Sequence, residues 1–186
     1  MNDPPTPPTV IRNAEPADLA EVLAIERAAF DAEPIDELVE NLLVDPTAAP
    51  WVSLLALRED RPVGHILFTK GHLQTEGGQP VVFLLAPLAV VPDAQSQGVG
   101  GRLIEAGLDA LRRAGADLVF VLGHPDYYPR HGFRPAGVLG FEAPYPIPDD
   151  VADAWMVQEL KPGCIGRLRG RVACATAMDR PEYWRE

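Results

Sequence analysis

The chain has 186 residues and a formal net charge of −11 at pH 7, with 47% hydrophobic and 23% charged residues. This length favours one domain with a substantial core, and the composition excludes a disordered or fibrous chain. The negative charge opposes a nucleic-acid partner, because phosphate binding draws its affinity from clustered Lys and Arg. An acidic surface would attract a cationic amine, although acidity also simply confers solubility.

The sequence also argues against a membrane partner and against a metal. No apolar run approaches the roughly 20 residues that cross a bilayer, and the first ten residues lack the features of a secretion signal. We therefore expect a cytoplasmic protein. Cys164 and Cys174 are the only cysteines, and they have neither redox spacing nor enough neighbouring ligands for a metal site.

The N-terminal half predicts helices followed by a hairpin. Residues 1–9 are rich in proline and should form a flexible tail, so the domain is expected over residues 10–160. A short strand at 10–12 precedes a helix that Pro16 and Asp18 open, and a second helix is predicted from 35 to 44. Strands at 51–57 and 62–69 flank a polar turn, and a long link covers 71–79.

The centre of the chain predicts a strand–helix–strand unit. The run 80–91 is almost wholly apolar and should be a central strand buried on both faces. A helix from 98 to 114 and a strand at 116–122 follow, and this order requires a parallel strand pair joined by a right-handed crossover. The fold class is therefore mixed α/β.

The remaining segments predict shorter elements. A short helix at 127–131 leads to a strand from Phe133, and a strand at 155–160 follows a proline-rich loop. The C-terminal extension, residues 161–186, carries a local basic run that we interpret as a solvated edge. Its piece 170–177 could add a last strand.

The junction after the central strand has the features of an anion site. Gln95-Ser96-Gln97-Gly98-Val99-Gly100 leads into a helix, whose first turn leaves N–H groups without internal partners. Gly98 and Gly100 let the backbone approach a phosphate, although such a glycine pair is as often only a packing device. The P-loop pattern is excluded because Gly101-Arg102 follows Gly100, and the dinucleotide fingerprint because Leu103 stands where a third glycine is required.

At these residues the sequence resembles a known family. Gln95 to Leu103, after Leu88-Ala89-Val90-Val91-Pro92, resembles motif A of the GNAT superfamily of N-acetyltransferases, Gln/Arg-x-x-Gly-x-Gly/Ala. Tyr128-Pro129-Arg130-His131-Gly132-Phe133 resembles that superfamily's motif B. The resemblance covers roughly residues 10–160 and includes features of a bacterial subgroup of predicted acetyltransferases.

The resemblance implies a fold, a cosubstrate and a set of binding residues. The sheet should be mostly antiparallel and flanked by helices, with a parallel pair that splays apart to hold acetyl-CoA. Backbone groups of Leu88, Ala89 and Val90 would pair with the amides of pantetheine, and an amide there would stabilise the developing oxyanion. N–H groups from Gln97 through Arg102 would hold the pyrophosphate. The implied cofactor-binding residues are Leu88, Ala89, Val90, Gln95, Ser96, Gln97, Gly98, Val99, Gly100, Gly101 and Arg102.

The resemblance also places Tyr128 as the general acid that protonates the leaving CoA thiolate. A tyrosine that only packs against the cofactor is the alternative reading, and Tyr127 is the neighbouring candidate. The attacking amine, with a pKa of about 10.4 if it resembles lysine, must lose a proton. The sequence does not identify the base; His65, His124 and Asp126 are candidates, and a strand histidine such as His65 is more often structural.

The expected function is therefore transfer of an acetyl group from acetyl-CoA to a primary amine of a small molecule or peptide. Segments 30–50, 71–79 and 134–150 should shape the acceptor site, and they do not reveal the acceptor. Two other readings stay open: a regulatory module that binds acyl-CoA without transfer, and a partner-binding protein that assembles through residues 161–186. The resemblance also leaves a homodimer open, because superfamily members commonly pair through late strands.

Overall fold

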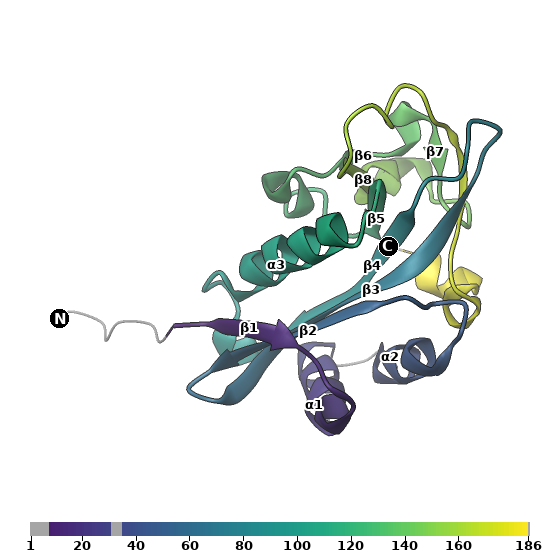
Figure 1. The fold of residues 1–186 in the computed structure, drawn as a ribbon. Helices are drawn as coiled ribbons and strands as arrows, with labels where there is room; N and C mark the ends of the chain where they lie inside the picture. The colour runs from purple at the N-terminus through teal and green to yellow at the C-terminus, as the bar shows by residue number, and fades with distance from the viewer. Residues whose placement is uncertain (1–7, 31–34, 186) are drawn as a thin grey trace.

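A computed structural model describes residues 8–30 and 35–185, and it shows one twisted sheet with helices on both faces (Figure 1). In this part of the chain nine strands form the sheet, whose main path runs in the order β1-β2-β3-β4-β5-β8-β6. The strands are β1 (Val10–Asn13), β2 (Val52–Arg58), β3 (Arg61–Gln74), β4 (Val82–Val90), β5 (Leu118–Leu122), β6 (Arg134–Pro135), β7 (Phe141–Glu142), β8 (Trp155–Glu159) and β9 (Gly170–Ala173). The tail predicted for residues 1–9 falls almost wholly outside the described residues.

Three α-helices cover the sheet. They are α1 (Leu19–Ala29), α2 (Ile35–Val44) and α3 (Val99–Arg113). Figure 1 shows α1 and α2 on one face and α3 on the other. The helix predicted from 98 to 114 is confirmed as α3, and its inner side carries Leu103, Ile104, Leu108 and Leu111, all of which are buried. Gly115 follows the helix cap Ala114, and its φ of +78° is the left-handed conformation that glycine tolerates.

The predicted mixed fold is confirmed, including its mostly antiparallel sheet. Most neighbouring strands pair antiparallel, whereas β4 and β5 are parallel on either side of the α3 crossover. The β2–β3 hairpin turns at Glu59 and Asp60, both of which have positive φ. This conformation matches the twist of the paired strands.

One predicted link is partly a strand. Residues 71–74, expected in the long link, continue β3 to Gln74. The extension pairs with β9, where His72 faces Ala173 and Gln74 faces Arg171. Its partners come from the C-terminal extension about 100 residues away, so local sequence could not reveal them.

A buried polar triad ties α1 to the sheet. Glu26 of α1 and Ser53 of β2 flank His65 of β3, with Glu26 Oε1 2.6 Å from His65 Nδ1 and Ser53 Oγ 2.9 Å from His65 Nε2. Glu26 and His65 are wholly buried, and burial raises the pKa of the Glu26 carboxyl above its ordinary value. Each group depends on the others because water cannot replace a lost partner.

We predict that His65→Ala lowers the free energy of unfolding by about 3 kcal/mol or more, since it leaves a buried carboxylate unpaired and opens a cavity. Urea unfolding measures this change. Arg12→Ala is the control: it breaks the exposed Arg12–Asp18 ion pair and should change stability little. Equal stability of the two variants would contradict a structural role for the triad.

Candidate active site

The site begins where β4 and β5 stop pairing. Their ladder covers only Val82–Leu84 and Leu118–Phe120. Beyond it each strand stays paired on its other side, β4 with β3 as far as Val90 and β5 with β8 as far as Leu122. The two strands therefore diverge inside the sheet, as the family resemblance predicted, and leave an open backbone edge on β4.

A bulge marks the divergence. Ile66 faces Leu88 and Phe68 faces Leu85, so β4 has one more residue than β3 across this interval. The extra residue falls at Ala86–Pro87, and Pro87 has no N–H to donate to a neighbouring strand. A proline inside a central strand is a signal of such an irregularity that the sequence offered and the prediction did not use.

After the bulge, backbone groups of β4 alternate between β3 and the open edge. Val91 N donates to Val63 O at 3.0 Å, which fixes the phase of the ladder. Residue 89 therefore also faces β3, opposite His65, whereas Leu88 and Val90 direct their backbone groups to the open edge. Of Leu88, Ala89 and Val90, the residues predicted to pair with pantetheine, Leu88 and Val90 present their backbone to the open edge, whereas Ala89 is used by β3.

Two glutamine side chains shape the turn that follows β4. Gln95 Nε2 donates to Val90 O at 2.9 Å, and Gln97 Nε2 donates to Asp93 O at 2.9 Å. Arg58, at the end of β2, donates to both Oε1 and the backbone O of Gln97. These side chains hold the loop in shape, and the Gln95 contact occupies one carbonyl of the open edge.

The turn places the N-terminus of α3 beside the open edge of β4, where Gly100 lies next to Leu88. Gly98 caps the helix with φ +80°, and a Cβ at this position would meet no atom within 4 Å. Ser96 also has positive φ. The first helical hydrogen bond runs from Arg102 N to Gly98 O at 3.1 Å, so the amides before Arg102 precede the helical ladder. An exposed space thus adjoins donors that can hold an anion.

The next two glycines lie under other side chains. A Cβ on Gly100 would stand 2.5 Å from the hydroxyl of Tyr127, and one on Gly101 would stand 3.0 Å from Cε1 of His131. Both partners belong to the segment around η3 (Tyr128–His131). The two motifs found in the sequence therefore pack directly on each other, and Gly100 makes room for a tyrosine.

Tyr128, the first residue of η3, is buried against its neighbours. Its ring passes over Gly123, where a Cβ would be 2.5 Å from Tyr128 Cε2. It makes edge contacts with Tyr127 at 5.3 Å and with Phe133 at 5.6 Å between ring centroids. This packing fixes the direction of the ring.

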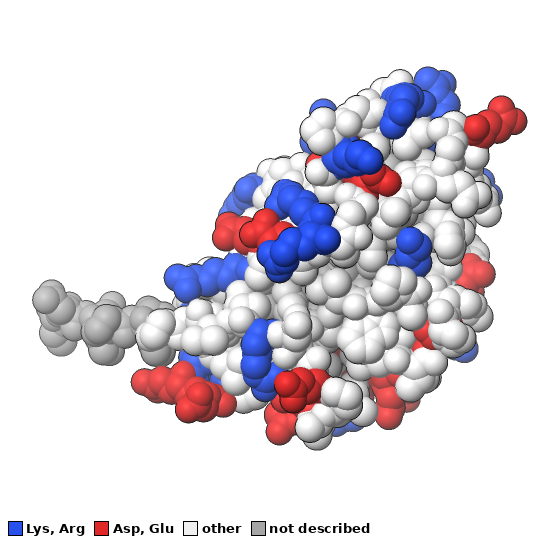
Figure 2. All heavy atoms as spheres, in the orientation of Figure 1, with Lys and Arg blue, Asp and Glu red and all other residues white. Residues whose placement is uncertain are grey.

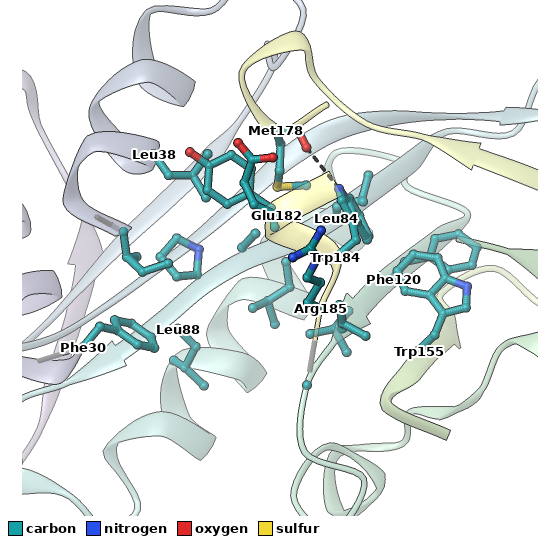
Figure 3. A pocket seen from close by; sticks show the side chains of 18 of the residues that line it. Phe30, Leu38, Leu84, Leu88, Phe120, Trp155, Met178, Glu182, Trp184 and Arg185 are labelled. Atoms are coloured by element: carbon teal, nitrogen blue, oxygen red, sulfur yellow. Dashed lines mark hydrogen bonds between the residues drawn. The ribbon is translucent and has the colours of Figure 1, made fainter. Parts of the chain in front are cut away.

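A cavity of about 690 Å³ opens between the diverging strands (Figure 3). The strands contribute residues 84–88 and 120–122 to its walls, followed by Gly123, His124 and Tyr128. Phe30 and α2 form one further wall, and the C-terminal residues from Met178 to Arg185 form another. Tyr128 and the open edge of β4 thus face one chamber.

The lining of the cavity includes one of the predicted candidate bases and two further carboxylates. His124 lines it, whereas His65 is enclosed by Glu26 and Ser53, and Asp126 is exposed outside it. Glu37 and Glu182 also line it. Sequence reasoning missed both carboxylates because a surface glutamate in a helix or tail has no local pattern that marks it.

Three further observations concern the described residues. Figure 2 shows charges of both signs over α3 in place of a continuous basic surface. Within residues 8–30 and 35–185 no three His, Cys, Asp or Glu side chains gather as a metal site would require. The same residues contain no helix with the length and hydrophobicity to span a bilayer.

Comparison with known proteins identifies the family. The model of the acetyltransferase (GNAT) family matches residues 17–133, more than half of the chain. The N-acetyltransferase YjhQ of Escherichia coli strain K12 is 47% identical over 160 residues, which cover 86% of this chain and 88% of that protein.

Two solved structures share the fold. The GNAT family N-acetyltransferase YhbS of Escherichia coli, in complex with CoA, superposes with a TM-score of 0.84 at 26% identity over 97% of this chain and 96% of that one. A GNAT family acetyltransferase of Brucella melitensis, in complex with acetyl-CoA, gives 0.73 at 29% identity, over 92% and 98%. The chain therefore belongs to the acetyltransferase (GNAT) family and is an acyltransferase of the N-acetyltransferase type.

Proposed function

We propose that this enzyme transfers an acetyl group from acetyl-CoA to a primary amine. The observation that carries the proposal is that the open edge of β4 and Tyr128 face one cavity, and that Gly100 at the N-terminus of α3 lies beside Leu88 of this edge. The two structural relatives that hold CoA and acetyl-CoA support the choice of cosubstrate.

The diphosphate fits at the turn before α3. Gly98 offers open space and a left-handed backbone, and the amides of Val99, Gly100 and Gly101 point out of the first turn. The Arg102 amide is used within the helix, so its exposed side chain is the part available to a phosphate. Because Tyr127 covers Gly100, we place the diphosphate on the Gly98 side of the turn.

The pantetheine arm fits along β4. It would extend the sheet from the backbone groups of Leu88 and Val90, in the way that a peptide adds to an exposed strand edge. The carbonyl of Val90 already accepts from Gln95, which leaves its N–H and the groups of Leu88. An N–H on this edge can donate to the thioester oxygen as negative charge develops there.

The chemistry then follows from the residues around the cavity. Acetyl-CoA supplies a thioester carbon, which the amine nitrogen attacks as the C–S bond breaks. Tyr128 donates its hydroxyl proton to the sulfur, and its buried, packed ring holds the hydroxyl in one direction. His124, Glu37 and Glu182 are the groups of the cavity wall that can take the proton from the ammonium ion.

The cellular location and the oligomeric state are also proposals. Cys164 and Cys174 are both free thiols, as expected in a reducing compartment such as the cytoplasm. We keep a homodimer as the proposed assembly, and mass measurement in solution tests it.

We predict that Gly98→Val raises the Kd for acetyl-CoA by about tenfold or more, because a branched side chain would fill the phosphate space. Calorimetry measures the Kd. Gly115→Val is a matched control at the other end of α3, with φ +78° and open space around it. It carries the same backbone strain and should leave the Kd unchanged. Equal effects of the two substitutions on the Kd would contradict the placement of the diphosphate at Gly98.

We predict that Tyr128→Phe lowers kcat about 100-fold or more, with the Kd for acetyl-CoA unchanged, because only proton donation is lost. The release of the CoA thiol measures turnover. The protein's own thiols should react slowly, since burial raises the pKa of Cys174 to about 12 and also raises that of Cys164. An unchanged kcat would show that Tyr128 is not the proton donor. If Tyr127→Phe lowers kcat instead, Tyr127 is the donor.

We predict that Gly100→Ala weakens acetyl-CoA binding mainly through Tyr127. The added Cβ would lie 2.5 Å from the hydroxyl oxygen but 3.6 Å from Tyr127 Cζ, an ordinary contact. Adding Tyr127→Phe should therefore restore most of the lost affinity. A double-mutant cycle by calorimetry measures this coupling, and additive effects would contradict the packing of the two motifs.

A further inference from the structure

The C-terminal segment, residues 175–185, forms the wall of the cavity that faces α2. Met178, Arg180, Glu182, Tyr183, Trp184 and Arg185 line the cavity from this side. Phe30, Glu37 and Leu38 line it from the side of α1 and α2. Figure 3 shows Glu182, Trp184 and Arg185 on the segment that borders the cavity, with Phe30 and Leu88 across from them. An acceptor that reaches Tyr128 from this side must pass between the two walls.

Hydrogen bonds fix the segment in place. Thr176 N donates to Thr47 Oγ1 and Ala177 N donates to Asp45 Oδ2, both at 2.8 Å. Tyr145 donates its hydroxyl to Asp179 Oδ1 at 3.0 Å. These contacts attach the segment to the end of α2 and to the loop before β8, so its side chains start from a defined backbone.

An aromatic contact anchors the far end of the segment. Trp184 Nε1 donates to Met178 O at 3.1 Å, which closes the segment on itself. The Trp184 ring is buried and meets Trp155 edge-on, with 5.8 Å between ring centroids. Together with Leu84, Leu88 and Phe120, the two indoles give the cavity a largely apolar floor. Such a floor favours an acceptor with a large apolar group.

The rim of the cavity carries charges of both signs. Arg180, Glu182 and Arg185 come from the C-terminal segment, and Glu37 comes from α2. All four are exposed, and none forms an ion pair with another residue of the described ranges. The neighbouring Arg27 and Asp36, by contrast, pair with each other at 2.6 Å. The rim therefore offers two cationic and two anionic groups to a ligand.

This charge arrangement distinguishes between classes of amine. A simple ammonium ion would pair with the carboxylates but would also meet two guanidinium groups, and like charges weaken binding. A molecule that carries both an ammonium and a carboxylate pairs with both kinds of group. Arginine suits the second role because its planar donors match a carboxylate in a bidentate manner.

We propose that the acceptor is a free amino acid with a large apolar or aromatic side chain. Its carboxylate pairs with Arg180 and Arg185, and its side chain lies on the Trp155–Trp184 floor. Its ammonium group loses one proton to Glu37, Glu182 or His124, and the free amine forms the C–N bond as the C–S bond breaks. Tyr128 gives its proton to the leaving sulfur, and the phenolate that remains takes the second proton from the acylated nitrogen, so the products are an N-acetylated amino acid, CoA and the protonated base. This proposal rests on the proposed function.

The test compares phenylalanine with phenylalanine amide and 2-phenylethylamine, which keep the ring and the amine but lack the carboxylate. We expect phenylalanine to have a kcat/KM at least about tenfold higher than either, measured by thiol release. In the double variant Arg180→Ala/Arg185→Ala the KM for phenylalanine should rise about tenfold or more. Its kcat/KM should then no longer exceed those of the two amines that lack the carboxylate. Calorimetry on the CoA-saturated protein should show the same loss of phenylalanine affinity.

A matched control and a separate binding measurement complete the test. Arg113→Ala removes an exposed arginine of α3 and should leave the preference for phenylalanine unchanged. Equal or better activity with the amines that lack a carboxylate would overturn the proposal, as would an unchanged preference in the double variant. If the wild-type protein binds acetyl-CoA but acetylates no amino acid, the acceptor proposal alone fails. If it does not bind acetyl-CoA, the proposed function fails first.

Discussion

The site depends on one constraint in the sheet: β4 and β5 pair over three residues and then part. Each strand remains held by its outer neighbour, so neither can turn back to close the gap. The bulge at Ala86–Pro87 places a residue without an N–H in β4 and shifts the register at the point of divergence. The centre of the sheet therefore keeps a backbone edge that no neighbouring strand pairs, and such an edge is stable only where water, a side chain or a ligand can reach it.

The crossover helix places the anion site beside this edge. Because α3 must return the chain from β4 to a parallel β5, its N-terminus lies directly beyond the end of β4. The segment after β5 then folds back, so that Tyr127 and His131 cover the first turn of α3. Two motifs about 30 residues apart in sequence thus become one packed unit, in which the turn where we propose the diphosphate binds also packs against Tyr127.

Sequence patterns predicted the helices, the main strands and the glycine turn because each has a local physical cause. Leu103 and Leu111 follow the helical period, and Gly98 stands at a strand–helix junction. The end of β3 was missed because its partner β9 is distant in the chain, and Glu26 because a carboxylate inside a helical pattern normally faces solvent. The cavity wall at residues 175–185 has no periodicity, since its shape comes from contacts with Thr47, Asp45 and Trp155.

The proposed cofactor site and the proposed acceptor site come from different parts of the chain. The family model covers residues 17–133, which include the open edge of β4, the turn at Gly98 and Tyr128. The C-terminal segment lies beyond that region and contributes most of the rim charges. In the functions we propose, cofactor recognition uses backbone groups and so tolerates changes of side chain, whereas acceptor recognition uses exposed side chains on a hydrogen-bonded segment. Substitutions at Arg180 or Arg185 can therefore alter the acceptor without disturbing the core, which is how one fold can serve different amines.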